Sequence, residues 1–289
     1  MRAIDLHTHT CKSDGSYTPT ELVDYAAEKK LAAVAITDHD SIEGLDEAVA
    51  HAAALKKRGL PSVEVIPGIE FSTKYEKQDV HIVGLYISYE KEEFQNALGD
   101  FVDSRVTRNI KMCENLQSAG IDITYEKLLA MYPDAVITRA HYASYLLEHG
   151  YVKSRQDAFA RYLGDHTKYF VPREKVTPSQ AVELILKADG VPVLAHPPLY
   201  HMGSDRLEAL VSCLKADGLM GIEVFYSTYS NQDVRDMQRL ADKYDLLVSG
   251  GSDFHGANKP GLDLGCGYGK LFVPEETLLK IKAALPRSS

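Results

Sequence analysis

The feature that most constrains the fold of this chain is an alternation of short apolar runs with helical patterns, present toward both ends of the sequence. Apolar runs predict strands at 4–7, 31–37, 63–66, 80–87, 191–195, 221–225 and 246–249. Helical patterns lie at 18–30, 42–58, 205–216 and 231–244, and a last one begins near residue 274. Such alternation favours a mostly parallel sheet, open or closed into a barrel. The sequence therefore predicts an α/β fold.

The middle of the chain, about residues 91–171, breaks this alternation because its pattern is helical throughout. Predicted helices occupy 92–119, 125–131, 140–149 and 155–163. Gly150 falls where a helix C-terminus favours glycine. We therefore predict an α/β domain made of residues 1–90 and 172–289, and a small all-helical insertion domain at 91–171.

Composition argues against several classes of partner. No apolar run approaches the roughly 20 residues that span a bilayer, and the first residues lack the apolar stretch of a signal peptide. The net charge of −9 argues against broad binding of duplex nucleic acid, which requires a basic surface. The four scattered cysteines form no C-x-x-C pair, as expected of free thiols in a reducing compartment. We expect a cytoplasmic protein with no membrane partner.

Histidines and carboxylates recur where the predicted strands end or begin. The positions are His7, His9, Asp14, His39, Glu70, His81, His196, Asp253 and His255. His7 and His9 are two residues apart in a predicted strand, so both imidazoles point to the same face of it. In parallel α/β sheets and barrels, active sites form at the carboxyl ends of the strands. These side chains are therefore candidates for one common site.

Each motif taken alone has an ordinary structural explanation. The two histidines of H-T-H can be plain polar residues, S-D-G a turn, Glu70 a helix cap and His81 a core histidine. However, six of the eleven histidines coincide with strand ends and have carboxylates nearby. Burying so many imidazoles requires a compensating partner, and a divalent metal ion supplies one. The residues together predict a metal site.

In their order along the chain, these motifs resemble those of the PHP family of metal-dependent phosphoesterases, named for polymerase and histidinol phosphatase. They are D-L-H-T-H-T, S-D-G, T-D-H-D, G-I-E-F-S, H-I-V-G-L-Y, A-H-P and S-D-F-H-G, within about residues 1–87 and 177–267. The resemblance implies a distorted (β/α)7 barrel and three divalent ions. It places one ion on His7, His9, Glu70 and Asp253, a second on Glu70, His81 and His196, and a third on Asp14, His39 and His255. Glu70 would bridge the first two.

The chemistry that the resemblance implies is hydrolysis of phosphate esters. Imidazole and carboxylate ligands without thiolate fit Mn, Fe or Zn. Bound metal ions would attract an anionic substrate even to an acidic chain, and they acidify a water into a hydroxide nucleophile. The predicted catalytic residues are Glu70, His196 and Asp253.

Patterns in the middle segment resemble one PHP subgroup with a helical insertion. They are T-R-A-H, G-Y-V, A-F-x-R-Y-L and Y-F-V-P, and members of the subgroup include a 3′,5′-nucleotide bisphosphate phosphatase, an exoribonuclease acting on short RNA and a cyclic phosphodiesterase. The resemblance implies that Arg139 clamps a phosphate, since arginine offers two parallel donors. The alternative is a surface arginine in a first helical turn. Other predicted substrate-binding residues are His141, Lys168, His201 and Lys259; the last two could equally be solvated loop residues.

The sequence thus predicts an enzyme with a small phosphorylated substrate. We expect a phosphatase acting on small nucleotides such as 3′,5′-bisphosphates, or on short oligonucleotides. Alternatives are a cyclic phosphodiesterase of sugar phosphates, a non-catalytic metal-stabilised module and an amide hydrolase. After A-H-P the chain has Pro198-Leu199 where many relatives have glycine and a basic residue, and residues 164–168 are less basic than in nucleotide-acting members. Both differences bear on the substrate and not on metal binding.

Overall fold

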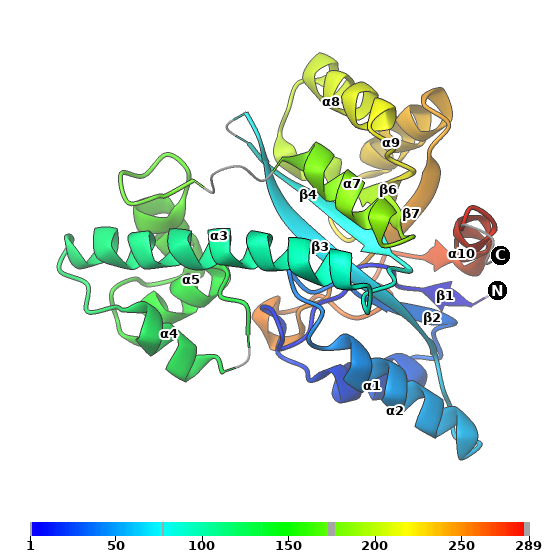
Figure 1. Cartoon of the computed structure of the whole chain (residues 1–289), viewed down its shortest axis with the longest axis horizontal. Coiled ribbons are helices and arrows are strands. Elements are labelled where there is room, and N and C mark those ends of the chain that lie inside the picture. Colours follow the sequence, from blue (N-terminus) through cyan, green and yellow to red (C-terminus); the bar gives the residue numbers. More distant parts are fainter. Residues whose placement is uncertain (1, 77, 134, 173–176, 286–289) are drawn as a thin grey trace.

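The computed structural model describes residues 2–76, 78–133, 135–172 and 177–285 (Figure 1). The strands are β1 (Ala3–Ile4), β2 (Ala33–Ile36), β3 (Glu64–Tyr75), β4 (Gln78–Leu85), β5 (Val191–Leu194), β6 (Gly221–Tyr226), β7 (Leu247–Gly251) and β8 (Val273–Pro274). The α-helices are α1 (Pro19–Glu28), α2 (Leu45–Lys57), α3 (Glu92–Gln117), α4 (Tyr125–Met131), α5 (Arg139–Glu148), α6 (Arg155–Ala158), α7 (Pro178–Lys187), α8 (Ser204–Ala216), α9 (Asn231–Lys243) and α10 (Glu275–Ala283). Shorter elements are the π-helix η1 (Phe159–Leu163) and the 3₁₀-helices η2 (Pro197–Tyr200) and η3 (Gly256–Asn258). No helix in this part of the chain is long and apolar enough to cross a membrane.

Several helices begin at sequence signals. At α1 the Thr18 hydroxyl accepts from the Glu21 N–H and the Glu21 carboxylate accepts from the Thr18 N–H, which satisfies two donors of the first turn. α7 lies outside the predicted helices, although Thr177 and Gln180 form the same capping box at its start. The predicted helix at 155–163 is α6 followed by a turn of π-helix.

Six of the described strands form one curled sheet, in the order β2-β3-β4-β5-β6-β7. The pairs β2–β3, β5–β6 and β6–β7 are parallel, whereas β4 is antiparallel to both of its neighbours. β3 ends at Tyr75 and β4 begins at its pairing partner Gln78. So short a connection can only return the chain antiparallel. The predicted α/β fold is confirmed, and β4 is the exception to its parallel pairing.

The closing segment, residues 5–9, lies between the two edge strands of this sheet. On one side the Asp5 N–H donates to Ala33 O of β2 (3.1 Å). On the other side the Leu6 N–H donates to Gly250 O of β7 (3.2 Å). The start of the chain is therefore held against strands from both ends of the sequence.

The Asp5 side chain anchors this closing segment. Its carboxylate accepts hydrogen bonds from the Ser252 N–H (2.8 Å), the Ser252 hydroxyl (2.5 Å) and the Gly265 N–H (2.8 Å). Burial raises the pKa of Asp5 to about 6, although these hydrogen bonds oppose the rise. The carboxyl group thus ties the beginning of the chain to the segment after β7.

Apolar side chains fill both faces of the curled sheet. In β2, Val34 and Ile36 belong to one hydrophobic cluster, and Ala33 and Ala35 belong to another. Successive strand residues point to opposite faces, so β2 is buried on both sides. This explains why its sequence is apolar throughout.

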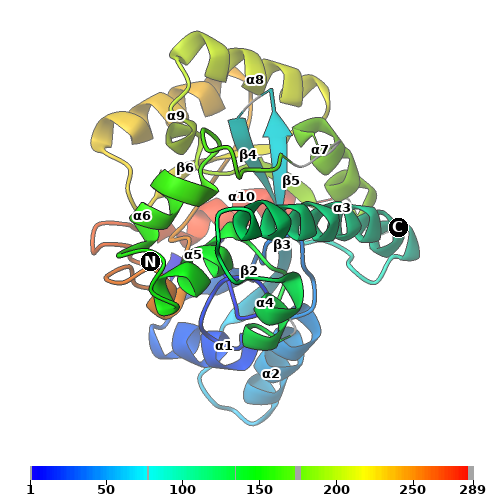
Figure 2. The same ribbon diagram turned by 90° about the vertical axis from the view of Figure 1, so that its left-hand side faces the viewer.

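The later part of α3 and the helices α4, α5 and α6 pack around a hydrophobic cluster of their own. Its buried members include Met112, Leu116, Leu128, Tyr142 and Leu146. Figure 1 shows α4 and α5 beside the sheet with α3 reaching toward them, and Figure 2 looks at the molecule from their side. Arg105 of α3 forms a buried ion pair with Asp40, in the loop after β2. This pair connects the helical segment to the sheet.

Gly251 lies where β7 meets the closing segment, and a side chain there would collide with it. An added Cβ would lie 2.4 Å from His7 N and 2.5 Å from His7 Cβ. We expect Gly251→Ala to lower the free energy of unfolding by about 1–3 kcal/mol, the usual cost of overpacking. Thermal unfolding checks this against Gly203→Ala, where an added Cβ meets no atom within 4 Å. Equal melting temperatures for the two variants would contradict the expectation.

Candidate metal centre

The nine predicted metal-ligating side chains lie together at one edge of the curled sheet. They come from the closing segment (His7, His9), the loop before α1 (Asp14), the segments after β2, β5 and β7 (His39, His196, Asp253, His255) and the β3–β4 hairpin (Glu70, His81). The prediction that Glu70 follows a strand is wrong, because pairing with β4 extends β3 to Tyr75. Since β4 runs antiparallel, His81 near its start reaches the edge where the parallel strands end.

Glu70 lies at the centre of this cluster, and its side chain is 1% exposed. Five imidazole nitrogens lie within 3.2 Å of its carboxylate: those of His7, His9 and His39 at Oε2, and those of His81 and His196 at Oε1. An ionised carboxylate accepts about four hydrogen bonds, so hydrogen bonding alone does not account for five rings. The arrangement suits cations held between Glu70 and the imidazoles.

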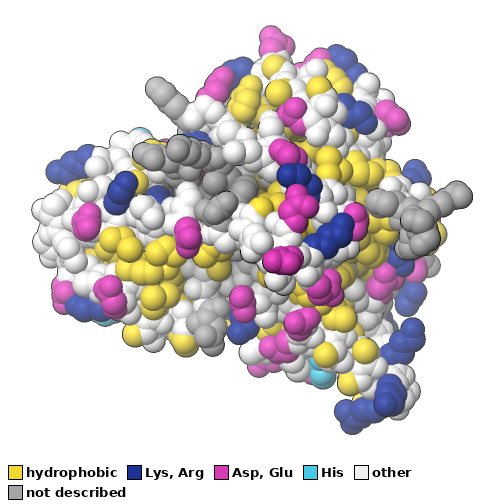
Figure 3. Space-filling view, in the orientation of Figure 1, with side chains coloured by type: hydrophobic (Ala, Val, Ile, Leu, Met, Phe, Trp, Pro, Cys, Tyr) yellow, Lys and Arg dark blue, Asp and Glu magenta, His cyan; other side chains and the backbone are white. Residues whose placement is uncertain are grey.

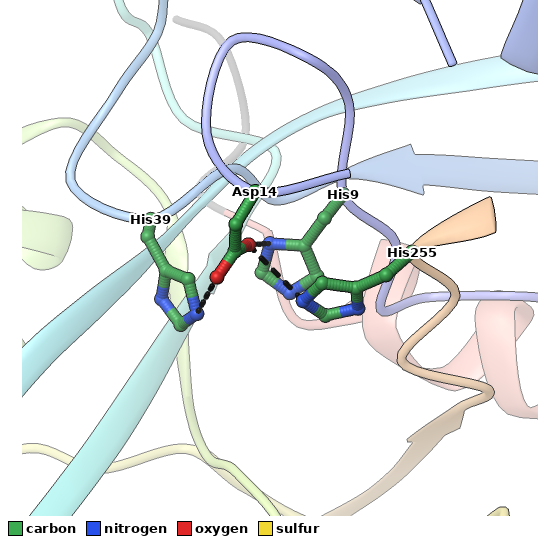
Figure 4. A group of neighbouring side chains, drawn as sticks. All are labelled: His9, Asp14, His39 and His255. Carbon is green, nitrogen blue, oxygen red and sulfur yellow. Dashed lines mark ion pairs between the residues drawn. The ribbon is translucent and has the colours of Figure 1, made fainter. Parts of the chain in front are cut away.

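Asp14 belongs to a second part of the cluster, with His9, His39 and His255 (Figure 4). Asp14 Oδ1 is 3.1 Å from His255 Nε2. The other two rings stand farther away, with His9 Nδ1 3.8 Å from Oδ1 and His39 Nε2 3.9 Å from Oδ2. These separations exceed a hydrogen bond, yet one potential ligand atom from each residue lies within 4.8 Å of the others. The four groups leave room for an ion between them.

The two carboxylate oxygens of Asp253 have different surroundings. Oδ1 is 3.3 Å from His9 Nε2 and 3.7 Å from His7 Nε2. Oδ2 accepts hydrogen bonds of 2.5 Å from the Tyr226 hydroxyl and from Lys259 Nζ. Two donors therefore orient the carboxylate so that its other oxygen faces the cluster.

Several buried polar atoms of the cluster have no hydrogen bond of acceptable geometry. They are Nε2 of His7, Nε2 of His9, Oδ1 of Asp14 and Nδ1 of His196. A buried polar atom left unsatisfied costs about 1–3 kcal/mol. A divalent cation bound by imidazole and carboxylate removes that cost. The residues present therefore fit a divalent metal ion.

The carboxylates of the cluster are ionised, whereas its imidazoles differ in protonation. Burial raises the pKa of Asp253, but the nearby charges of Lys259, His255 and His7 outweigh it and hold that pKa well below its usual range. Burial lowers the pKa of His39 to about 3. Burial also lowers the pKa of His7, His9 and His81, but nearby carboxylates outweigh it and raise the pKa of each, so these rings must lose a proton before they bind metal. Ionised carboxylates and neutral imidazoles are the forms that bind metal.

Glu223 of β6 contacts two residues of the cluster, and the sequence did not single it out. Its Oε1 lies 2.9 Å from His7 Nδ1, and its Oε2 accepts from the His196 N–H (2.6 Å). The first contact occupies His7 Nδ1, so the other ring nitrogen, Nε2, is the one that faces the cluster. The second holds His196 in a left-handed backbone conformation, with φ of 32°. A single glutamate inside the buried run G-I-E-V-F was the available signal, because a buried charge requires a partner.

Asp38 positions the loop that carries Asp14. Its Oδ1 accepts from the Thr10 N–H (2.8 Å) and the Ser13 hydroxyl (2.5 Å), and its Oδ2 accepts from the Thr10 hydroxyl (2.6 Å). Gly15 closes the same loop tightly, since an added Cβ would lie 2.3 Å from a backbone oxygen. The loop is thus fixed by hydrogen bonds that do not involve the Asp14 side chain.

Of the cavities that adjoin the cluster, two are lined by several of its residues. The metal-centre cavity, of about 370 Å³, is lined by cluster residues together with Arg155, Phe159, Leu199, Tyr226 and Lys259. The basic cavity, of about 220 Å³, is lined by Lys74, Arg105, Arg108, Arg139, Phe159 and Phe170. Asp14, His39 and His81 line both cavities. A ligand at the cluster can therefore extend from one cavity into the other.

Arg139 lies in the basic cavity, where carboxylates already contact it. Its Nη1 is 2.7 Å from Asp165 Oδ1, and its Nη2 forms an ion pair with Asp79. Lys74 Nζ contacts the same two residues, at 2.6 Å and 3.1 Å. Two cations and two anions thus form a neutral network, and a phosphate would have to replace a carboxylate to bind Arg139.

His141 is buried at the start of α5, outside these two cavities, and lines a further cavity of about 170 Å³ together with Asp14. Its Nδ1 accepts from the Thr138 N–H (3.0 Å), and burial lowers its pKa to about 4. The Thr138 hydroxyl in turn accepts from the Ala140 N–H (3.2 Å) and donates to Asp14 Oδ2 (3.0 Å). His141 therefore supports a helix cap that contacts the cluster.

Lys168 and His201 also lie outside both cavities. Lys168 is exposed, with its Nζ 5.0 Å from the centre of the Tyr169 ring. His201 is exposed at the end of η2. Contact of either residue with a substrate stays a prediction, whereas Arg139 and Lys259 do line the cavities.

The fold and the cluster together define an α/β protein built to bind divalent metal ions. A family model of the PHP domain matches residues 5–176. The chain therefore belongs to the PHP domain family, and the resemblance seen in its motifs is confirmed.

Known relatives extend the match over most of the chain. A 3′,5′-nucleoside bisphosphate phosphatase from Chromobacterium violaceum is 36% identical over 92% of this chain and 91% of its own length. A 5′-3′ exoribonuclease from Haemophilus influenzae is 37% identical over 87% of this chain and 89% of its own length. The structure of a predicted metal-dependent phosphoesterase from Bifidobacterium adolescentis is 31% identical, with a TM-score of 0.83 over 98% of this chain and 96% of that chain. The prediction of a phosphate-ester hydrolase is confirmed at the level of reaction class.

Glu223 supports two cluster groups at once, so its loss should weaken metal binding without removing a predicted ligand. We expect Glu223→Ala to lower the affinity for metal by about 10- to 100-fold, the usual effect of removing such a partner. Titration of the metal-free protein with Mn²⁺ or Zn²⁺ measures the change. Glu208→Ala is the control, because Glu208 is only half-buried on α8 and pairs with Lys243. An affinity equal to that of the control would show that Glu223 has no such role.

Proposed function

We propose that this chain releases phosphate from small nucleotides such as 3′,5′-bisphosphates, or cleaves short oligonucleotides, with the help of divalent metal ions. The observation that carries the proposal is a cluster of histidines and carboxylates in a cavity that adjoins a second cavity lined by basic side chains. The ions would attract the scissile phosphate of the substrate. The basic side chains would attract its second phosphate. The similarity to a bisphosphate phosphatase supports the choice of substrate.

We propose three ions, of Mn, Fe or Zn, on the ligands that the family resemblance implies. One set is His7, His9, Glu70 and Asp253; another is Glu70, His81 and His196; the third is Asp14, His39 and His255. Ligand atoms of His7, His9 and Asp253 lie within 4.8 Å of one another, as do those of Asp14, His39 and His255. The central position of Glu70 supports a bridging role between the first two sets.

When bound, the ions would supply an acidified water as nucleophile and neutralise phosphoryl oxygens. The residues of the chain orient these groups: Glu70, His196 and Asp253 would hold the ions in place. Lys259 lines the same cavity. Burial lowers the pKa of Lys259, but Asp253 and other carboxylates outweigh it and raise that pKa, so the side chain is charged. We propose that its ammonium group, which donates to Asp253 Oδ2, also contacts a substrate phosphate.

We propose that Arg139 binds a phosphate remote from the scissile bond. Its present partners, Asp79 and Asp165, are only partly buried. An incoming phosphate can therefore exchange with one of these carboxylates while the other keeps the guanidinium in place. Phosphate offers the same paired oxygens that arginine prefers.

The surface supports a small or single-stranded substrate rather than duplex nucleic acid. The face in Figure 3 carries acidic and basic side chains mixed together, and the chain has a net charge of −9. Broad binding of a duplex requires an extended basic surface.

Two features of the architecture are proposals as well. The closing segment would act as the seventh strand of a distorted (β/α)7 barrel, supported by its hydrogen bonds to β2 and β7. The segment 91–171 would form an insertion domain in an α/β domain of residues 1–90 and 172–289, supported by its separate hydrophobic cluster.

We also propose a cytoplasmic location for the protein. The free state of all four cysteines supports this proposal, because disulfides are rare in a reducing compartment.

A panel of substrates tests the proposed function. Protein loaded with Mn²⁺ would be incubated with adenosine 3′,5′-bisphosphate, a short RNA and a cyclic sugar phosphate, and product release measured for each. We expect release from the nucleotide substrates. Cleavage of the cyclic sugar phosphate alone would favour the cyclic phosphodiesterase, and no cleavage of any substrate would favour a non-catalytic module.

Replacing Glu70 should affect metal content and turnover together. Glu70→Gln keeps the size of the side chain but removes the charge that two ions would share. We expect bound metal to fall from about three ions per chain and turnover to fall by more than about tenfold. Elemental analysis and phosphate release measure the two effects. Glu64→Gln on the same strand is the control, because Glu64 is exposed and pairs with Lys282; full activity of Glu70→Gln would exclude the bridging role.

Replacing Arg139 should separate substrate binding from metal binding. We expect Arg139→Ala to retain the metal ions and to lose about 2–4 kcal/mol of transition-state stabilisation on a bisphosphate, the scale for removing one partner of a desolvated charge pair. The loss should be smaller on a simple aryl phosphate, which has no second phosphate. Comparing kcat/KM for the two substrates measures this, with Arg161→Ala, an exposed arginine, as control. Equal losses on both substrates would place Arg139 at the scissile phosphate instead.

A further inference from the structure

Two phenylalanine rings line the site without belonging to a hydrophobic core. Phe159 is 36% exposed and lines both cavities, and Phe170 lines the basic cavity. Neither ring belongs to the three hydrophobic clusters formed by the described residues. Packing in a core therefore does not explain the position of either ring.

The backbone holds Phe159 in an unusual turn. Phe159 begins the π-helix η1, and its carbonyl oxygen accepts from the Gly164 N–H, five residues later (2.9 Å). Turns of π-helix are rare and occur frequently at functional sites. Figure 2 shows α6, which leads directly into η1, in front of the sheet. The turn fixes the residue at the boundary between the two cavities.

Cationic groups lie over both rings. The guanidinium carbon of Arg139 is 5.8 Å from the centre of the Phe159 ring and 5.3 Å from that of Phe170. Lys74 Nζ is 4.9 Å from the centre of the Phe170 ring. Cations favour the face of an aromatic ring, so these contacts help to orient the rings. The basic cavity thus offers flat aromatic and guanidinium surfaces as well as positive charge.

A third apolar side chain lines the metal-centre cavity. Leu199 is 39% exposed and lies outside the same three clusters. It lies in η2, three residues after His196. Exposed apolar groups beside a charged cluster favour a ligand that has an apolar face of its own.

We propose that Phe159 stacks against the aromatic base of a nucleotide whose scissile phosphate lies at the metal centre, with Phe170 and Leu199 lining the space around the base. This inference rests on the proposed function and adds the part of the substrate that the chain recognises. Every base has an aromatic face, so stacking of this kind tolerates any base. A sugar phosphate without a base gains no such contact.

A fluorescence titration tests the stacking directly, because the chain contains no tryptophan. Phe159→Trp would introduce a single tryptophan at the boundary of the cavities, and its fluorescence can be excited separately from that of the tyrosines. In the metal-loaded protein we expect adenosine 5′-phosphate to quench this fluorescence and ribose 5-phosphate to leave it unchanged. The matched control is Phe272→Trp, since Phe272 is 48% exposed and lines neither cavity. Equal quenching by the two ligands, or none by the nucleotide, would overturn the proposal.

Kinetics provides a second readout. The ratio of kcat/KM for adenosine 3′,5′-bisphosphate to that for the same bisphosphate without its base should fall roughly tenfold in Phe159→Leu, the scale of one lost stacking contact. Phe159→Trp should preserve the ratio, since it keeps an aromatic face. An unchanged ratio in Phe159→Leu would overturn the proposal. If the unmodified protein released phosphate from neither substrate, the proposed function would fail, and the fluorescence titration would still decide whether a base stacks on this side chain.

Discussion

Backbone hydrogen bonds on both sides of the closing segment hold the two edges of the curled sheet together, and the geometry of the site depends on them. They place His7 and His9 opposite the segment after β7, which carries Asp253. Because neighbouring strand residues point to opposite faces, a shift of one residue in this pairing would turn both imidazoles away from the cluster. The buried hydrogen bonds of Asp5 resist such a shift, since they connect the same segment to Ser252.

Burying the side chains of the cluster lowers the stability of the folded chain. The cluster gathers imidazoles and carboxylates out of water, and several of their polar atoms lack hydrogen bonds. Groups outside the cluster hold it in position, with Glu223 supporting His7 and His196, and Asp38 supporting the loop of Asp14. Binding of a cation would give these unsatisfied polar atoms a partner. Metal binding would therefore stabilise the folded state, and the two processes are coupled through these side chains.

The sequence predicted the α/β fold and the residues of the cluster because each of those signals is local: an apolar run, followed by a histidine or a carboxylate where the run ends. It did not predict the direction of β4, which depends on a short turn, or that Glu70 lies inside a strand. Glu223 was missed because its partners, His7 and His196, lie far from it in the sequence. Arg139 was predicted as a phosphate clamp, but its contacts with Asp79 and Asp165 are set by the tertiary structure, which a motif does not reveal.

The hydrogen bond from Thr138 to Asp14 joins the cap of α5 to a predicted ligand of the cluster. A cation that fixes the Asp14 carboxylate would therefore also stabilise its hydrogen bond with Thr138. By the same coupling free energy, a ligand that stabilises the start of α5 would favour cation binding at Asp14. A substitution that moves Thr138 would therefore change the orientation of the Asp14 side chain, while Asp38 would still hold the backbone of its loop.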